Sequence, residues 1–280
     1  MSIRGTTRIT GIFGFPVEHS LSPAMHNAAF EHLGLDYCYV PFSVSPERLE
    51  DAVKGVRALR IRGVNVTVPH KERVIPFLDE VGEEASFIGA VNTVVNDDGV
   101  VRGFNTDGRG FMQSLAEAGI DPAGKRILMV GAGGAARAVG YYLCREAAAV
   151  YLYNRRRERA VSLAGSLNTL RGNVSVVDSD ALGSKEVMAS LDIVINTTPL
   201  GLSPDDPLPL EVTMLTGHHV VCDLIYKRTP LLREAAERGC ATLDGLGMLL
   251  WQGVYAFELW TGLRPPVEVM RAAIQRSSRP

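Results

Sequence analysis

The chain has 280 residues, and its 29 Lys and Arg residues nearly balance 31 Asp and Glu residues, for a formal net charge of −2. This balance offers no basic surface for nucleic acid or an anionic membrane, and the length is sufficient for two domains. No apolar run is long enough to cross a membrane, and the first residues lack the apolar segment of a signal peptide. We therefore expect a cytoplasmic protein that binds neither nucleic acid nor membranes.

The cysteines form no recognisable metal or redox motif. The chain has four, without C-x-x-C spacing, at positions 38, 144, 222 and 240. Isolated cysteines of this kind are typical of reduced thiols in the cytosol. We expect neither disulfides nor a metal site.

Residues 1–106 alternate between strand and helix patterns. Apolar runs predict strands at 9–15, 37–42 and 64–68, and Ser-Pro pairs predict the starts of helices at 22–33 and 45–59. This alternation predicts a small, mostly parallel α/β sheet.

Two hydroxyls, Ser20 and Ser22, flank the start of the first predicted helix. In one interpretation Ser22 caps the helix and Ser20 belongs to a turn. In the other, the pair binds a polar, anionic small molecule beside the free N–H groups of the helix. The spacing favours neither interpretation over the other.

Lys71 follows a strand whose C-terminal end carries polar residues. Asn65 and Thr67 interrupt the apolar pattern there, and ligands of open α/β sheets bind beyond the C-terminal ends of strands. A lysine in a cleft can exchange protons at a lowered pKa, whereas a lysine at a helix start is usually solvated. We expect its neighbour His70 to be structural or exposed.

Polar residues also mark the segment up to residue 107. The run 89–95 predicts a strand with Asn92 in its middle, and 96–99 predicts a hairpin turn. Thr106 and Asp107 precede a helix expected at 111–118. Asp107 either caps this helix or lies at a domain junction, where it faces Lys71.

Residues 126–138 predict a dinucleotide-binding turn, because a strand pattern, a glycine turn and an Ala-rich helix pattern follow one another. Gly131 allows the tight turn, Gly133 lets the backbone approach a pyrophosphate, and Ala136 lets helix and strand pack closely. The helix N-terminus adds free N–H donors and the positive end of its dipole.

The next strand, at 150–153, ends without the acidic residue that binds the ribose of NAD. Asn154 is followed instead by Arg155, Arg156, Arg157 and, after one glutamate, Arg159. Guanidinium groups suit a 2′-phosphate because they donate paired, charge-assisted hydrogen bonds. The pattern predicts NADP; the alternative is a basic helix start with no phosphate partner.

The rest of the chain continues the alternation. We expect strands at 192–196 and 220–224, an apolar helix at 246–260, a last helix to about residue 274 and a frayed end from residue 277. Tyr226 lies just beyond the second of these strands. Gln252, in the apolar helix, either satisfies a core network or binds substrate.

Taken together, these stretches resemble the shikimate dehydrogenase family. The motifs occur in order along nearly the whole chain: HSLSPAMHN (19–27), GVNVTVPHK (63–71), GAVNTV (89–94), NTDGRG (105–110), GAGGAARA (131–138), NRRRER (154–159), NTTPLG (196–201), DLIYKRTPLL (223–232) and DGLGMLLWQ (244–252). The resemblance implies NADPH-dependent, reversible reduction of 3-dehydroshikimate to shikimate, in chorismate and aromatic amino acid biosynthesis.

The resemblance also implies an organisation. We expect an α/β protein with two α/β domains: a substrate-binding catalytic domain over 1–106 and a Rossmann-type NADP-binding domain over 107–244. The helices of residues 245–280 are expected to return to the first domain. The sequence leaves the oligomeric state open, with a homodimer as one option.

On the substrate side, the family pattern places Lys71 and Asp107 as the catalytic pair and Ser20 and Ser22 on the substrate carboxylate. It places further substrate contacts at Thr67, Asn92, Asp107 and Gln252, with Tyr226 nearby. Hydride transfer would leave negative charge on the substrate oxygen; Lys71 would donate the proton, and Asp107 would orient Lys71.

On the cofactor side, the pattern places contacts at Gly131, Ala132, Gly133, Gly134, Ala135, Asn154, Arg155, Arg159, Leu224 and Gly245. Glu83 matches an acid that is sometimes assigned to the cofactor side. Arg156 departs from the family, which commonly has Thr there, so the details of the 2′-phosphate contacts differ while its positive surroundings are retained.

Three alternatives stay open. One is a quinate/shikimate dehydrogenase that also accepts NAD, against which the arginine run argues. Another is a non-catalytic NADP-sensing protein on the same fold, which would not need Lys71 and Asp107. The third is a folate-linked dehydrogenase, for which Ser20 and Ser22 have no explanation.

Overall fold

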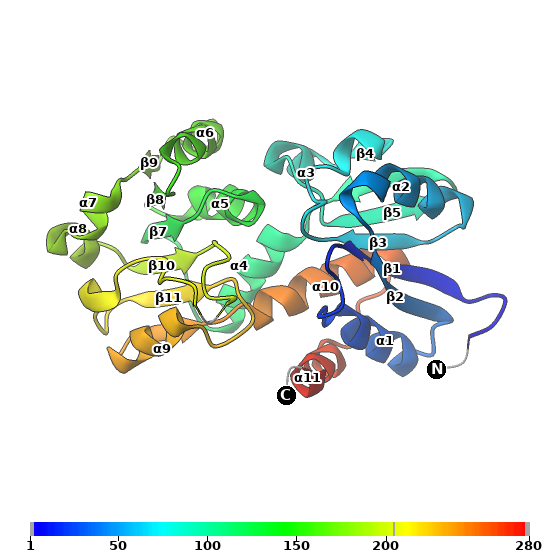
Figure 1. Cartoon of the computed structure of the whole chain (residues 1–280). Helices are drawn as coiled ribbons and strands as arrows, with labels where there is room; N and C mark the ends of the chain where they lie inside the picture. The colour runs from blue at the N-terminus through cyan, green and yellow to red at the C-terminus, as the bar shows by residue number, and fades with distance from the viewer. Residues whose placement is uncertain (1–2, 204, 278–280) are drawn as a thin grey trace. The chain divides into compact units, whose positions relative to one another are not determined.

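The computed structural model describes residues 3–203 and 205–277. The chain separates into two compact units. Figure 1 colours the ribbon by residue number, from blue at the N-terminus to red at the C-terminus. The first unit runs to Thr106 and resumes at Leu250, and the second spans Asp107–Leu249. Helix α10 (Leu246–Thr261) therefore begins in the second unit and continues in the first.

The first unit contains a sheet with the strand order β2-β1-β3-β5-β6-β4. Its strands are β1 (Arg8–Gly14), β2 (Tyr37–Ser43), β3 (Gly63–Val66), β4 (Glu80–Val81), β5 (Thr93–Asp97) and β6 (Val100–Phe104). β1 is parallel to β2 and β3, and β4 is parallel to β6. The prediction of a mostly parallel sheet is confirmed, although β5 is antiparallel to both of its neighbours.

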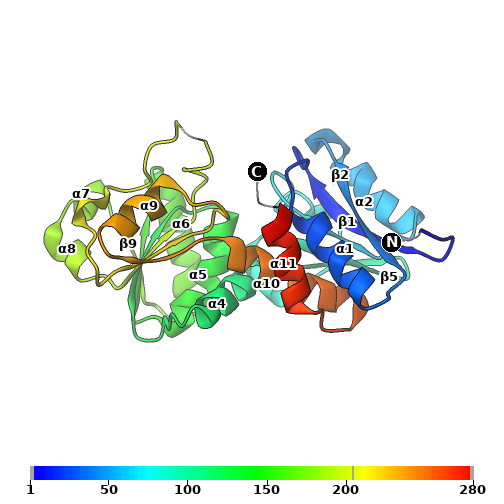
Figure 2. The same ribbon diagram turned by 90° about the horizontal axis from the view of Figure 1, so that it is seen from below.

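Helices cover both faces of this sheet. α1 (Ser22–His32) and α11 (Val267–Ser277) lie side by side on one face, as Figure 2 shows. On the other face, α2 (Leu49–Ala58) buries the apolar side chains of Leu49, Val53 and Val56 against the sheet. The polar residues that follow β1 and β3 are thereby held at the end of a rigid core.

The second unit has the strand order β12-β11-β10-β7-β8-β9, and every described pairing is parallel. Its strands are β7 (Arg126–Val130), β8 (Ala149–Tyr153), β9 (Val174–Val176), β10 (Ile193–Asn196), β11 (Val220–Asp223) and β12 (Ala241–Leu243). The order matches the doubly wound dinucleotide-binding fold, which binds its ligand at the end of the first strand, here β7.

The helices of the second unit also follow the predicted alternation with the strands. They are α4 (Asp107–Glu117), α5 (Gly134–Glu146), α6 (Arg157–Asn168), α7 (Ser179–Leu182), α8 (Lys185–Ala189) and α9 (Pro230–Glu237). Short 3₁₀ turns lie at Ile75–Phe77 and Val212–Met214, and α3 (Glu83–Ile88) belongs to the first unit.

Several predicted boundaries were wrong for local reasons. The strand expected from residue 89 begins at Thr93, because Gly89 ends α3 in a left-handed conformation with φ of 69°. The helix expected from residue 111 begins at Asp107. Ser22 is the first residue of α1 and not its cap, which is Leu21. The last helix, expected to end near residue 274, continues to Ser277, and residues 278–280 of the end expected to fray lie outside the described residues.

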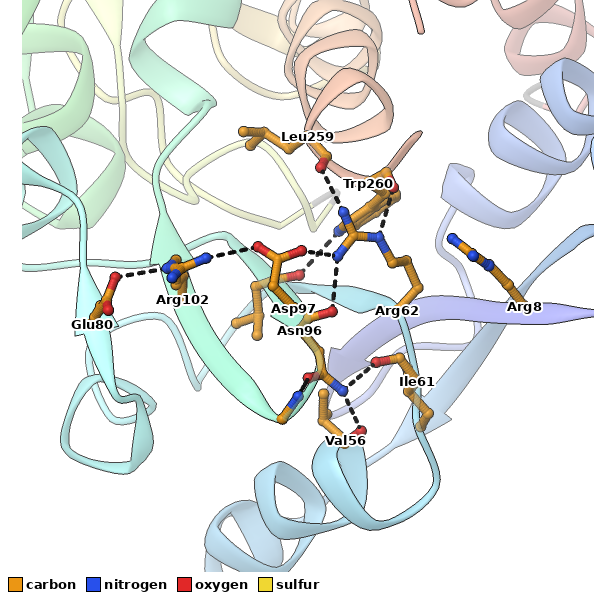
Figure 3. A network of polar contacts seen from close by, with 12 residues as sticks. Arg8, Val56, Ile61, Arg62, Glu80, Asn96, Asp97, Arg102, Leu259 and Trp260 are labelled. Carbon is orange, nitrogen blue, oxygen red and sulfur yellow. Dashed lines mark hydrogen bonds and ion pairs between the residues drawn. The ribbon is translucent and has the colours of Figure 1, made fainter. Parts of the chain in front are cut away.

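A polar network joins the C-terminal end of α10 to the first sheet (Figure 3). Arg62 donates from Nε to the carbonyl oxygen of Trp260, at 2.7 Å, and from Nη1 to that of Asn96, at 2.8 Å. It also pairs with Asp97, which Arg102 shares. Because the last carbonyls of a helix lack intrahelical donors, Arg62 supplies bonds that the helix itself cannot make.

Two composition-based expectations can be compared with the structure. The four cysteines are free, and all four are buried. Among the described residues, no helix is long and apolar enough to cross a membrane, and no cluster of side chains could hold a metal ion.

Candidate active site

The two hydroxyls before and at the start of α1 lie next to each other. The backbone N–H of Ser22 donates to Oγ of Ser20 over 3.3 Å. Ser20 is half-buried and Ser22 is 4% exposed. The structure therefore brings the predicted carboxylate-binding pair together at the N-terminus of a helix, where free N–H groups favour an anion.

A buried network of side chains lies across the first sheet. The hydroxyl of Tyr39, in β2, donates to Oδ1 of Asn65 over 2.8 Å. Asn65 then donates from Nδ2 to the carbonyl oxygen of Asn92 and to Oγ1 of Thr93, both at 3.2 Å. β2, β3 and β5 are thus joined by side chains close to the predicted substrate site.

The network continues to the segment before α4. Nδ2 of Asn92 donates to Oγ1 of Thr106 over 3.0 Å, and the N–H of Thr106 donates back to Oδ1 of Asn92 over 2.8 Å. Oγ1 of Thr106 also donates to the carbonyl oxygen of Gln252 over 3.1 Å. Asn92 and Gln252, predicted from distant stretches, therefore lie in one network of the first unit. Gln252 is 8% exposed.

Lys71 and Thr67 are held by their backbones. The carbonyl oxygen of Lys71 accepts from the N–H of Val91 over 2.8 Å, and the N–H of Thr67 donates to the carbonyl oxygen of Phe13 over 2.9 Å. Both side chains are half-buried. His70 between them is fully buried, with Nε2 2.7 Å from the carbonyl oxygen of Val44, so its structural interpretation is confirmed.

Asp107 is the first residue of α4 and is 5% exposed. It follows Thr106 directly, so the network that fixes Thr106 also fixes the backbone from which the Asp107 carboxylate starts. Lys71 belongs to the first unit, whereas Asp107 and Tyr226 belong to the second.

The glycine loop of the second unit has the geometry that its sequence predicts. Gly131 has a φ of 116°, and a Cβ added to it would lie 2.3 Å from Oγ1 of Thr197. Any other residue would therefore be strained and would also clash. The loop that follows β10 thus packs directly against the end of β7.

Gly133 precedes the first turn of α5, and a Cβ added there would have no other atom within 4 Å. Packing within the protein therefore does not require glycine at this position. Its absent side chain instead leaves the backbone open to a ligand, beside Ala132, Gly134 and Ala135. The N–H of Arg137 donates to the carbonyl oxygen of Gly133. The N–H groups that precede it in the first turn of α5 therefore have no acceptor within the helix. This cradle fits a pyrophosphate.

The arginines after β8 lie around the start of α6. Asn154 shapes the turn, because its Nδ2 donates to the carbonyl oxygen of Arg156 over 2.8 Å. Arg155, Arg156 and Arg159 are exposed, and none of the three makes an ion pair within the described part of the chain. Their positive charge is therefore available to a phosphate group.

Leu224 and Gly245, two further predicted cofactor contacts, lie against each other. The N–H of Gly245 donates to the carbonyl oxygen of Ile225 over 3.0 Å. A Cβ on Gly245 would lie 2.1 Å from the carbonyl oxygen of Leu224, so only glycine allows this close approach. Glu83, by contrast, is an exposed residue at the start of α3 in the first unit.

A buried carboxyl group holds this loop, and sequence reasoning gave it no role. Asp223 accepts hydrogen bonds from the side chains of Asn196, at 3.1 Å, and Thr229, at 2.8 Å. It also accepts one from the N–H of Ile225, at 3.1 Å. Burial raises the pKa of Asp223, and these bonds partly offset the effect. Polar residues at the ends of two buried strands were the signal that could have revealed this group.

Comparison with known proteins agrees with this geometry. Three family models match: the shikimate dehydrogenase substrate binding domain over residues 12–94, shikimate/quinate 5-dehydrogenase over 114–200, and the shikimate 5′-dehydrogenase C-terminal domain over 245–275. A curated relative from Desulforamulus reducens, named shikimate dehydrogenase (NADP(+)), is 50% identical over 98% of this chain and 97% of its own length. The chain belongs to the shikimate dehydrogenase family.

Solved structures agree with the membership in the shikimate dehydrogenase family. A crystal structure of a shikimate dehydrogenase in complex with NADP+ has a TM-score of 0.93 and 41% identity, covering 100% of this chain and 98% of its own. Quinate dehydrogenase from Corynebacterium glutamicum in complex with NAD has a TM-score of 0.88 and 36% identity, covering 96% and 99%. The predicted family and the predicted α/β fold are both confirmed.

Proposed function

We propose that this chain catalyses the NADP-dependent, reversible reduction of 3-dehydroshikimate to shikimate, a step of chorismate and aromatic amino acid biosynthesis. One observation carries the proposal. A single chain of this family combines a hydroxyl and amide network that suits a polar, anionic ring with a glycine cradle that is followed by unpaired arginines. The small-molecule partners are then shikimate and 3-dehydroshikimate.

The first unit, with the helices that return to it, is proposed to be the substrate domain. Ser20 and Ser22 would bind the carboxylate, because hydroxyl donors near a helix N-terminus stabilise an anion. Further contacts to the substrate hydroxyls would come from Thr67, Asn92, Asp107 and Gln252, with Tyr226 nearby.

The second unit is proposed to be the NADP domain. The cradle at Gly133 and the first turn of α5 would hold the pyrophosphate. Asn154, Arg155 and Arg159 would bind the 2′-phosphate, with Arg156 adding positive charge. Leu224 and Gly245 would lie on the nicotinamide side, and Glu83 is the weakest of the cofactor assignments.

When bound, NADPH supplies a hydride to the ketone carbon of 3-dehydroshikimate. Lys71 donates a proton to the ketone oxygen, where negative charge would otherwise develop, and so becomes neutral at Nζ. In this proposal Asp107 would accept a hydrogen bond from the ammonium group and orient it toward that oxygen. In the reverse direction the neutral Lys71 accepts the hydroxyl proton. A homodimer and a cytoplasmic location remain predictions.

A second candidate is a quinate/shikimate dehydrogenase with broader cofactor use, favoured by the likeness to the NAD-bound quinate dehydrogenase. The unpaired arginines after β8 argue against it, because NAD has no 2′-phosphate for them to bind. A non-catalytic NADP sensor is less consistent with the presence of both Lys71 and Asp107.

The proposal is tested by mixing the purified protein with shikimate and NADP+ and recording absorbance at 340 nm. We expect steady NADPH formation that depends on both compounds. No turnover over a range of pH and protein concentration would contradict the proposed function.

A further inference from the structure

Asp223 is a buried residue of the second unit to which the proposed reaction gives no role. It is the last residue of β11 and pairs in register with Asn196, the last residue of the neighbouring strand β10 (Figure 1). In the strand order, β10 lies between β11 and β7, which carries the glycine loop. Because these strands are parallel, Asp223 lies at the edge of the sheet where the cofactor is proposed to bind.

Three neutral groups donate to the carboxyl oxygens of Asp223, which is 1% exposed. Oδ1 accepts from Nδ2 of Asn196 and from the N–H of Ile225, both at 3.1 Å, and Oδ2 accepts from Oγ1 of Thr229 at 2.8 Å. The amide and the peptide N–H cannot accept a proton in return, so the arrangement suits the ionised carboxylate. Burial raises the pKa of Asp223, and the three hydrogen bonds act in the opposite direction.

No cation neutralises this carboxylate. Among residues 3–203 and 205–277, Asp223 takes part in no ion pair. The one charged group that affects its pKa is a second carboxylate, that of Asp244, which raises it further. A buried charge of this kind interacts strongly with a positive charge that comes close, because water screens it poorly.

The carboxylate lies beside the two residues proposed for the nicotinamide side of the cofactor. Leu224 follows Asp223 directly in the chain. Ile225, whose N–H donates to Asp223, accepts from the N–H of Gly245 over 3.0 Å. A Cβ added to Gly245 would lie 2.1 Å from the carbonyl oxygen of Leu224. Hydrogen bonds and close packing therefore hold both proposed contacts near the buried charge.

The oxidised and reduced forms of the cofactor differ in charge at the nicotinamide ring. The ring of NADP+ carries a positive charge, whereas the ring of NADPH, which has gained a hydride, is neutral. The phosphates, riboses and adenine are the same in both forms. A buried negative charge near the ring therefore stabilises NADP+ and has little effect on NADPH.

We propose that Asp223 sets the balance between oxidised and reduced cofactor by stabilising the positive charge of the nicotinamide ring. Asp223 acts through space and does not contact the substrate. Hydride release from bound NADPH becomes more favourable, because it forms the state of the cofactor that the carboxylate stabilises. The inference rests on the proposed function, since it requires NADP and NADPH to bind to the second unit.

Asp223→Asn tests the proposal, because it removes the charge and keeps the shape of the side chain. The amide oxygen can still accept from Asn196 and Ile225, and the amide nitrogen can donate to Oγ1 of Thr229. Titration without substrate measures Kd for NADP+ by calorimetry and Kd for NADPH by its fluorescence. We expect Kd for NADP+ to rise roughly tenfold, as for two partly screened unit charges, and Kd for NADPH to change by less than about twofold.

Two control variants separate the charge from other effects. Asp192→Asn removes a charge just before β10 begins, at the opposite end of that strand from Asn196, where the carboxylate accepts from the N–H of Arg126 over 2.8 Å. Thr229→Val removes the hydrogen bond to Oδ2 of Asp223 and keeps the charge. Neither variant should change the ratio of the two Kd values, because a loosened loop would affect both forms of the cofactor alike.

An unchanged ratio of the two Kd values in Asp223→Asn would overturn the proposal, as would an equal change of the ratio in either control. If Asp223→Asn does not fold, Asp223→Ser removes the same charge with a smaller side chain and should shift the ratio in the same direction. Binding of neither form by the wild-type protein would overturn the proposal together with the NADP assignment. Binding of both forms without oxidation of shikimate would contradict the proposed function alone.

Discussion

At the scale of single residues, Lys71 carries the proton transfer of the proposed reaction. Positioned acid–base catalysis contributes about 10²–10⁴-fold to a rate, so Lys71→Ala should lower kcat by at least ~10². KM should change by no more than several-fold, because the lysine acts on charge that appears in the transition state. Steady-state kinetics with shikimate and NADP+ measures both parameters.

Lys54→Ala is a suitable control for this variant. Lys54 is an exposed lysine of α2 that pairs with Glu50 over 2.8 Å, and it is not one of the proposed site residues. Its loss should leave kcat unchanged. If Lys71→Ala also retains the wild-type kcat, Lys71 takes no part in the chemistry.

His26 is the residue that should make stability depend on pH. It is completely buried, its two ring nitrogens have no partner among the described residues, and burial lowers its pKa from 6.5 to about 3. Below pH 6.5 the unfolded chain binds a proton that the folded protein does not bind until about pH 3. Stability contributed by the neutral ring is therefore complete above pH 6.5 and is lost as the pH falls.

The expected slope is about 1.4 kcal/mol per pH unit below the unfolded pKa. Denaturant unfolding at several pH values between 4.5 and 7.5 measures it. His26→Phe keeps an aromatic ring beside Tyr39 and Phe257 but cannot be protonated, so its stability should fall less steeply with acid. Parallel pH profiles for the wild-type protein and the variant would refute this prediction.

At the scale of elements, the start of α6 should determine cofactor choice. Removing both guanidinium groups in Arg155→Ala/Arg159→Ala deletes charge-assisted bonds to the 2′-phosphate. We expect KM for NADP+ to rise roughly tenfold or more, while kcat/KM for NAD+ is unaffected, since NAD+ has no such phosphate. Equal losses with both cofactors would show that these arginines support the fold and do not select NADP.

The contacts at the C-terminal end of α10 predict a difference between two arginines in Figure 3. Arg62 has a side chain 20% exposed and bonds to helix carbonyls, whereas Arg102 is 37% exposed and bonds to Glu80 and Asp97. Arg62→Met should lower the free energy of unfolding by about 1–3 kcal/mol. Arg102→Met should cost about 0–1 kcal/mol, as exposed ion pairs do. Similar losses in denaturant unfolding would contradict this account.

Elements with strong local signals could be predicted from the sequence. The glycine pattern predicted the turn between β7 and α5, and Gly131 there has a positive φ. The hairpin turn predicted at 96–99 joins β5 to β6. The weak strands β4, β9 and β12 have two or three residues each and were not predicted. So short a segment has no measurable alternation of apolar and polar residues.

The network through Tyr39 and Asn65 could not be predicted for a different reason. It requires β1 to lie between β2 and β3, so that residues 26 positions apart in the chain become hydrogen-bonded neighbours. Local patterns do not specify the order of strands in a sheet. Asn65 was recognised as a polar interruption of a strand, but its partners were not.

At the scale of the whole molecule, the family could be predicted because nine motifs follow one another in a fixed order. The alternation of strands and helices gave the α/β class and the mostly parallel sheets. It did not give the antiparallel placement of β5, which depends on the hairpin to β6. The roles of the site residues remain proposals that kinetics must test.

The central claim is that this chain oxidises shikimate with NADP+. It is tested most directly by initial rates at 340 nm with shikimate or quinate, each combined with NADP+ or NAD+. The account predicts turnover with shikimate and NADP+, and kcat/KM values at least roughly tenfold lower for every other combination, because the unpaired arginines favour the 2′-phosphate. Comparable turnover with quinate and NAD+ would contradict it.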